Sequence, residues 1–188
     1  MEINTHICNE DHSWALDNKF RRFFQPTDKI LQHLSLNGKR IVDLGCGPGY
    51  FTIPMAIAAG EKGLVTAVDV QAAMLVKVKN KIAGSPLEEK IVFHACPGDI
   101  IGLKEQFDLV FAFWMIHEVP DREKYINEIY KLLDNKGIFF MAEPKGHVKK
   151  SFFEESVNMA KREGFTVVDF PHVKFSRAVK LVKNSVEQ

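Results

Sequence analysis

A glycine-rich segment, Asp43-Leu44-Gly45-Cys46-Gly47-Pro48-Gly49-Tyr50, carries residue types suited to ligand binding. Glycines at alternate positions let the backbone turn sharply and approach a ligand with no side chain in between. An apolar run at 40–44 leads into the segment, and a stretch of helical character follows at 51–59. The start of such a helix offers N–H groups that have no partner within the helix. The spacing therefore predicts a small-molecule site at this turn.

Two aspartates indicate what kind of molecule this turn accepts. Asp69 lies near the end of the second apolar run, 64–70, where an acid can accept hydrogen bonds from both hydroxyls of a ribose. Asp43 suits a positively charged ligand better than a pyrophosphate. A dinucleotide fingerprint, G-x-G-x-x-G, would need a third glycine at position 50, where the chain has Tyr50. The aspartates indicate a nucleoside, although a NAD enzyme uses the same ribose acid.

Three further side chains are candidates for acid–base chemistry. His117 lies just beyond the apolar run 107–113, and an imidazole with a pKa of about 6.5 suits a general base. Glu118 and Glu143 are second candidates for the same role. The alternative for His117 is that it only shapes the adjoining loop.

The elements that must position these residues alternate between strands and helices. We expect strands at 40–44, 64–70, 91–95, 107–113, 138–142 and 165–170, with helices at 51–59, 72–82 and 151–163. A further helix is capped by Asp121 and stopped by Gly137, and 174–182 forms a last strand antiparallel to the sixth. Nearly continuous apolar strands separated by helices predict an α/β fold with an open, doubly wound, mostly parallel sheet of about seven strands.

The N-terminal part of the chain differs from this alternating core. Residues 1–38 hold two short amphipathic pieces separated by Pro26, and Thr27 or Asp28 is the expected cap of the second piece. We expect these N-terminal helices to form a cap or lid, within a single domain 1–188 whose core is 39–188. The aromatic side chains of the first piece either pack on the core or cover the substrate pocket: Trp14, Phe20, Phe23 and Phe24.

The composition of the chain excludes some classes of protein and argues against others. The chain has 188 residues, 25 basic and 24 acidic side chains, a net charge of +1, and 46% hydrophobic residues, which together exclude a disordered chain. The balanced charge argues against nucleic acid as a partner. Apolar runs fall short of the about 18 residues that a membrane span needs, and three cysteines without a secretory signal indicate a cytoplasmic protein. The oligomeric state stays open.

Three stretches carry a family resemblance. The segments GKRIVDLGCGPGYFT, VTAVDVQAAML and FDLVFAFWMIHEVPDREKYINEIYKLLDNKGIFFMAEP resemble the successive motifs of the class I S-adenosylmethionine-dependent methyltransferases. The resemblance covers about residues 36–144 and implies a Rossmann-like fold, S-adenosylmethionine as the cofactor and methyl transfer as the reaction.

The resemblance also implies a set of cofactor-binding positions: Asp43, Gly45, Cys46, Gly47, Gly49, Asp69, Val70, Asp99 and Phe113. Asp43 and the glycine backbone would hold the methionine end of the cofactor. Asp69 would take the ribose hydroxyls, Val70 would lie against the adenine, and the Phe113 carbonyl would accept from the cofactor's amino group. Asp99 follows a segment, HACPGD, about two residues longer than is usual before this acid.

The acceptor is expected to be a small molecule, methylated without a metal. The segment Phe113-Trp114-Met115-Ile116 lacks the Asn/Asp-Pro-Pro-aromatic motif of amino-methylating nucleic-acid enzymes and the acid that catechol-type enzymes use for a metal. One short His6/Cys8/His12 cluster is weak evidence for a metal site. An RNA or protein methyltransferase, a non-catalytic cofactor-binding module and a NAD-dependent oxidoreductase remain the alternatives.

Overall fold

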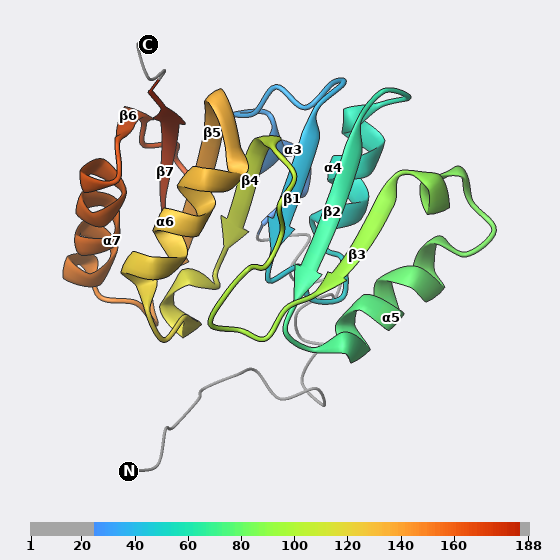
Figure 1. Ribbon diagram of the computed structural model, residues 1–188, viewed down its shortest axis with the longest axis horizontal. Coiled ribbons are helices and arrows are strands. Elements are labelled where there is room, and N and C mark those ends of the chain that lie inside the picture. Colours follow the sequence, from blue (N-terminus) through green and yellow to red (C-terminus); the bar gives the residue numbers. More distant parts are fainter. Residues whose placement is uncertain (1–24, 185–188) are drawn as a thin grey trace.

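A computed structural model describes residues 25–184, which form a seven-stranded sheet in the order β3-β2-β1-β4-β5-β7-β6 (Figure 1). The first five strands pair in parallel, and β7 pairs antiparallel with both β5 and β6. This arrangement confirms the predicted Rossmann-like, mostly parallel α/β sheet. The strands are β1 Arg40–Leu44, β2 Leu64–Asp69, β3 Ile91–Ala95, β4 Phe107–Phe113, β5 Leu133–Pro144, β6 Phe165–Asp169 and β7 Ser176–Lys183.

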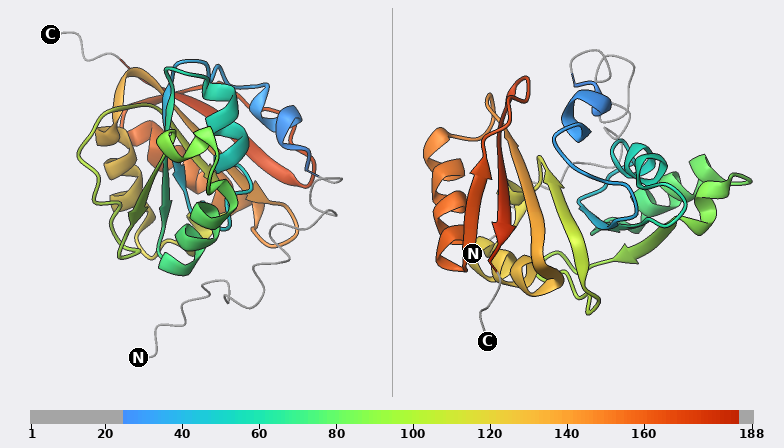
Figure 2. Two further views of the ribbon diagram at one scale, coloured as in Figure 1. Left: turned by 90° about the vertical axis from the view of Figure 1, so that its right-hand side faces the viewer. Right: turned by 90° about the horizontal axis from the view of Figure 1, so that it is seen from above.

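Helices cover both faces of the sheet. They are α3 Thr27–Leu31, α4 Thr52–Ala59, α5 Ala72–Ile82, α6 Arg122–Leu132 and α7 Lys150–Arg162, with short 3₁₀ turns η2 Pro86–Glu89 and η3 Ile116–Glu118. Buried side chains of α3 and α4 belong to one core cluster, and those of α6 and α7 belong to the other. The view from above shows these two pairs of helices on opposite sides of the sheet (Figure 2). Burial of β1 and β4 on both faces explains their nearly continuous apolar sequence.

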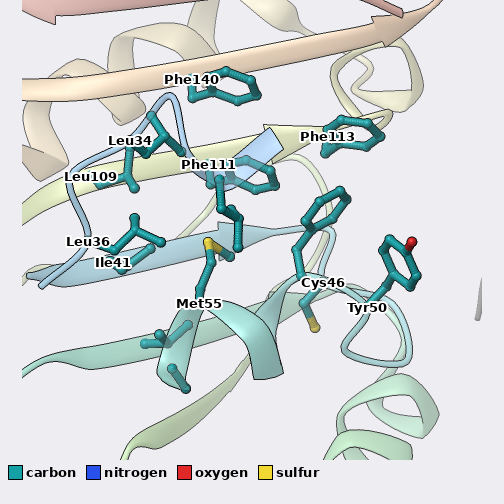
Figure 3. Packing of buried hydrophobic residues seen from close by; sticks show 14 of the residues in the cluster. Leu34, Leu36, Ile41, Cys46, Tyr50, Met55, Leu109, Phe111, Phe113 and Phe140 are labelled. Atoms are coloured by element: carbon teal, nitrogen blue, oxygen red, sulfur yellow. The ribbon is translucent and has the colours of Figure 1, made fainter. Parts of the chain in front are cut away.

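Aromatic and sulfur-containing side chains fill the first of these cores. The rings of Phe111 on β4 and Phe140 on β5 stack with their centroids 5.1 Å apart. Met55 of α4 is fully buried and points toward the strands that carry Ile41 and Phe111 (Figure 3). Such close packing fixes the strand ends from which the site residues project.

The structure corrects two of the predicted helix boundaries. Neither Thr27 nor Asp28 caps α3, because the N-cap residue is Pro26, in an extended conformation with no side-chain cap. The helix α6 ends at Leu132, well before Gly137, because Leu133 is extended and pairs with Phe107 of β4. The tertiary pairing of a fully buried leucine therefore ends this helix.

Some expectations fall on residues outside the described range. The aromatic side chains of the predicted lid and the His6/Cys8/His12 cluster all lie in residues 1–24. The division of the chain into a cap, 1–38, and a core, 39–188, stays a prediction. Within residues 25–184, no helix combines the length and the apolar character needed to cross a bilayer.

Candidate active site

The glycine-rich segment forms the turn between β1 and α4. Gly45 and Gly47 have φ angles of +64° and +52°, a region that glycine enters without steric cost. A Cβ atom at Gly45 would lie 2.9 Å from the Cβ of Met115, whereas one at Gly47 would meet no described atom within 4 Å. Gly45 is thus required for packing against the β4 loop, and Gly47 presents bare backbone to open space.

Two buried aspartates hold this turn in place. The Asp43 carboxylate accepts a hydrogen bond from the Thr52 hydroxyl at 2.6 Å. The Asp69 carboxylate accepts from the backbone N–H groups of Gly47 at 2.8 Å and Gln71 at 2.9 Å. Burial raises the pKa of Asp69, although these backbone hydrogen bonds act in the opposite direction. Asp69 therefore ties the glycine turn to the end of β2.

The turn opens onto a cavity of about 520 Å³ at the edge of the sheet where the parallel strands end. Its walls include nearly all residues that the sequence singled out: Asp43, Gly45, Cys46, Gly47, Asp69, Val70, Asp99, Phe113, His117 and Glu118. Gly49 is absent from the lining of this cavity within the described chain, and a Cβ atom there would lie 3.0 Å from Val78 of α5. Gly49 therefore serves the packing of α5 rather than the cavity surface.

Behind the cavity wall, Glu143 of β5 contacts His117 directly. His117 Nδ1 lies 2.5 Å from Glu143 Oε2, and His117 Nε2 lies 4.0 Å from Glu118 Oε1. The Glu143 side chain is 0% exposed and that of His117 is 13% exposed. Of the three acid–base candidates, His117 and Glu118 line the cavity, and Glu143 reaches it only through His117.

This arrangement changes the acid–base properties of His117. Burial alone would lower the pKa of His117, but the hydrogen bond to Glu143 and the charges of Glu143 and Glu118 outweigh it and raise the pKa. Burial raises the pKa of Glu118, opposed by His117 and assisted by Glu143 and Asp69. The imidazole is therefore a stronger base than in water, with a negative partner for its protonated form.

Burial makes Cys46 an unsuitable nucleophile, although it lines the cavity. Desolvation, followed by the charges of Asp43 and Asp69, raises the pKa of its thiol well above the usual range. Asp99 reaches the same cavity from the β3–β4 loop with a side chain that is 62% exposed, and its carboxylate lies 3.9 Å from Lys124 Nζ. Cys46 therefore contributes shape, and Asp99 is a rim residue.

Sequence reasoning missed two residues that shape the cavity. The His147 ring lies edge-on to His117 with the ring centroids 5.0 Å apart. Trp114 has a φ of +61°, which is uncommon for a residue with a side chain, and its indole N–H donates to Ser176 Oγ at 2.9 Å. The position of Trp114 directly after β4 was the available signal, whereas nothing in the sequence placed His147 beside His117.

The family is decided by comparison with known proteins. A family model described as a methyltransferase domain matches residues 35–184. The chain belongs to the S-adenosylmethionine-dependent methyltransferases. This family membership answers the predicted choice between a methyltransferase and a NAD-dependent oxidoreductase, and it identifies the cofactor as S-adenosylmethionine.

Individual relatives agree with this family. The methyltransferase chain is 32% identical over 166 residues to a demethylmenaquinone methyltransferase of Lactobacillus johnsonii, covering 80% of this chain and 67% of that protein. A demethylmenaquinone methyltransferase of Desulfitobacterium hafniense is 28% identical over 136 residues, covering 70% of this chain and only 51% of that protein. The chain therefore spans between about half and two thirds of these relatives.

A solved structure has the same fold as the methyltransferase chain. It is a SAM-dependent methyltransferase from Aquifex aeolicus, with a TM-score of 0.82, 19% identity, and coverage of 93% of this chain and 98% of that chain.

The residues around the cavity fit S-adenosylmethionine. The bare backbone at Gly47 allows close approach, because no side chain intervenes. The carboxylates of Asp43 and Asp69 offer acceptors for a cationic and hydroxylated ligand. The acceptor groups and the bare backbone of the cavity therefore agree with the cofactor of the family.

Proposed function

We propose that this chain transfers a methyl group from S-adenosylmethionine to a small hydroxylated molecule of the quinone-precursor type, without a metal. One observation carries the proposal: a single cavity is lined both by the glycine turn with Asp69 and by His117, and Glu143 contacts His117 from behind the cavity wall. The relatives named for demethylmenaquinone support this class of acceptor. Within residues 25–184, no group of three or more His, Cys, Asp or Glu residues is arranged to hold a metal ion.

Specific residues are proposed to hold the cofactor. Asp43 and the backbone of the glycine turn face its methionine end, where a positive charge favours a buried carboxylate. Asp69 is the acceptor for the ribose hydroxyls. Val70, which is 42% exposed at the cavity, lies against the adenine, and Asp99 lies at the rim beside it. The Phe113 carbonyl at the end of β4 accepts from the amino group.

His117 is proposed to remove the proton that the acceptor loses. In the neutral imidazole, Nδ1 keeps its proton and donates it to Glu143, so that Nε2 has a free lone pair for the acceptor hydroxyl. The charge that develops on the ring is then offset by Glu143 and Glu118. S-adenosylmethionine supplies the electrophilic methyl carbon, and the C–S electron pair remains on the departing thioether. For an acceptor such as reduced demethylmenaquinone, loss of the hydroxyl proton to His117 makes the neighbouring ring carbon nucleophilic, and that carbon forms the new bond to the methyl group. The ring carbon then releases its own proton to solvent, and the proton held on His117 restores the hydroxyl.

The substitution His117→Asn tests this role. An asparagine amide can still donate to Glu143 but has no basic nitrogen, so the buried carboxylate keeps a partner. We expect turnover with reduced demethylmenaquinone and labelled S-adenosylmethionine to fall by about 10²–10⁴-fold. The affinity for S-adenosylhomocysteine should stay within about threefold of the original value. His33→Asn, outside the cavity, is the matched control.

The pH–rate profile provides the second readout. The wild-type rate should rise with pH through an apparent pKa above the usual histidine value, because the protonated ring cannot accept a proton. His117→Asn should lose this limb of the profile. An unaltered rate and profile in His117→Asn would remove His117 from the mechanism.

A further inference from the structure

A second cavity, of about 680 Å³, lies between α7 and the segment that joins β6 to β7. Its described lining shares no residue with that of the first cavity. The two cavities are nevertheless neighbours. Trp114 and Pro144 line the first cavity, and Ser176 and Lys145 line the second. The Trp114 indole donates a hydrogen bond to Ser176, and Pro144 directly precedes Lys145 in the chain. The walls of the methyltransferase cavity and of this second cavity therefore adjoin each other.

Positive charge dominates the second cavity. Its walls carry Lys145, Lys150, Lys161 and Arg177, against the single carboxylate of Glu154. Glu154 pairs with Lys150 at 3.3 Å. In the part of the chain that the structure describes, Lys145, Lys161 and Arg177 form no ion pair. The whole chain has a net charge of only +1, so this cluster is a local excess of positive charge.

A hydrogen bond holds one of these cations in place, and the start of a helix adds to the positive field. The Arg177 guanidinium donates to the Val148 carbonyl at 3.0 Å, which anchors the half-buried side chain at the cavity wall. The 13-residue helix α7 begins at the cavity, and its N-cap residue, Lys149, makes no side-chain capping bond to the described chain. The start of a helix carries a partial positive charge and favours anions.

The floor of the same cavity is apolar. Phe153, Val157 and Val173 are at most 5% exposed and line it, and Phe170, which is 60% exposed, also lines the cavity. An apolar floor bounded by uncompensated cations matches a ligand with an apolar body and an anionic group. A fully hydrated inorganic anion would leave the apolar floor without a partner.

We propose that the second cavity is a binding site for a small apolar molecule that carries a carboxylate, phosphate or sulfonate group. The apolar body lies over Phe153 and Val157, and the anionic group meets Lys145, Lys161 and Arg177. This site is separate from the cofactor cavity. Its ligand therefore binds together with S-adenosylhomocysteine rather than in competition with it.

The test uses the fluorescent aromatic sulfonate 8-anilinonaphthalene-1-sulfonate as the probe, titrated into the folded chain. We expect saturable binding that persists in the presence of saturating S-adenosylhomocysteine and weakens as ionic strength rises. The double variant Lys145→Gln/Lys161→Gln should bind the probe about three- to tenfold more weakly, since both side chains are exposed and each contributes modestly. The neutral analogue N-phenyl-1-naphthylamine should bind wild type and variant equally.

Matched controls separate this proposal from the proposed methyltransferase function. Lys62→Gln/Lys79→Gln removes two exposed lysines elsewhere and should leave probe affinity unchanged. Unchanged melting temperatures will show that the variants are folded. Displacement of the probe by S-adenosylhomocysteine, or equal probe affinity in wild type and Lys145→Gln/Lys161→Gln, would overturn the second site. Failure of S-adenosylhomocysteine itself to bind would instead count against the proposed cofactor site.

Discussion

The pairing of His117 with Glu143 is the decisive contact at the scale of single residues. A carboxylate that is 0% exposed is costly to ionise unless a positive group compensates it. His117 provides that group at 2.5 Å, and the Glu143 carboxylate in turn raises the pKa of His117. The same contact fixes which ring nitrogen carries the proton, and this leaves Nε2 available to an acceptor.

Replacing Glu143 by glutamine should lower the pKa of His117. The amide keeps the shape of the side chain and removes both the negative charge and the carboxylate hydrogen bond that raise this pKa. NMR titration of the His117 ring signal measures the change directly. Glu89→Gln, an exposed site outside the cavity, should leave the titration curve unchanged. An equal pKa in wild type and Glu143→Gln would show that Glu143 does not control the ring.

The same pair predicts how stability depends on pH. Because the folded pKa of His117 is raised, the ion pair stabilises the fold fully below the unfolded pKa of about 6.5. This contribution disappears as the pH rises through the folded pKa. Glu143→Gln should therefore reduce the free energy of unfolding more at pH 5.5 than at pH 8.5, as measured by urea denaturation. A larger loss at the higher pH would contradict the assignment.

At the scale of elements, the turn from β1 into α4 combines packing with ligand access. Gly45 faces Met115 so closely that a side chain does not fit, whereas the Cβ position of Gly47 is open. The Gly47 N–H also donates to Asp69 and so joins the ends of β1 and β2. Gly45 and Gly47 therefore occupy the same turn for different physical reasons: close packing at Gly45 and open access to the backbone at Gly47.

Comparison of two alanine substitutions isolates the ligand contribution of this turn. Gly47 and Gly84 both have positive φ angles, +52° and +73°, and a Cβ at either would meet no described atom within 4 Å. Each alanine should cost about 1–2 kcal/mol of stability from backbone strain alone. Only Gly47→Ala should also weaken S-adenosylhomocysteine binding, by about tenfold or more in calorimetry. Similar affinities in the two variants would place the cofactor away from this turn.

Elements with a strong local pattern could be predicted from sequence. The bounds of β1, β3, β4 and α5 agree with the predicted runs, because these elements are marked by local apolar runs or apolar periodicity. The start of β5 could not be predicted, since it depends on Leu133 pairing with Phe107 across the sheet. The place of β7 between β5 and β6 likewise depends on long-range pairing, such as Met141 with Val179.

The candidate site was predictable to a similar degree. Residues at the ends of β1, β2 and β4 were found because parallel strands bring their carboxyl ends to one edge. From the sequence, His117 and Glu143 are alternative candidates for the same role. In the structure they are hydrogen-bonded to each other, with His117 just after β4 and Glu143 on β5. His147 comes from the loop after β5, and no local sequence pattern predicts that its ring contacts His117.

At the scale of the whole molecule, one edge of the sheet carries both cavities. The first combines the glycine turn, the buried aspartates and His117, and the second carries the positive charge beside α7. This division would let the proposed cofactor site coexist with a separate surface for another ligand. Within the described part of the predicted cap, residues 25–38, no residue lines either cavity.

Calorimetric titration with S-adenosylhomocysteine tests the central claim most directly. The claim predicts binding of one molecule per chain to the wild type and no binding of NAD under the same conditions. Asp69→Ala should weaken the affinity by about ten- to a hundredfold, because charge-assisted hydrogen bonds to the ribose are lost. Asp134→Ala, an exposed aspartate outside the cavity, should bind as the wild type does. Binding of NAD without S-adenosylhomocysteine, or an unchanged affinity in Asp69→Ala, would contradict the account.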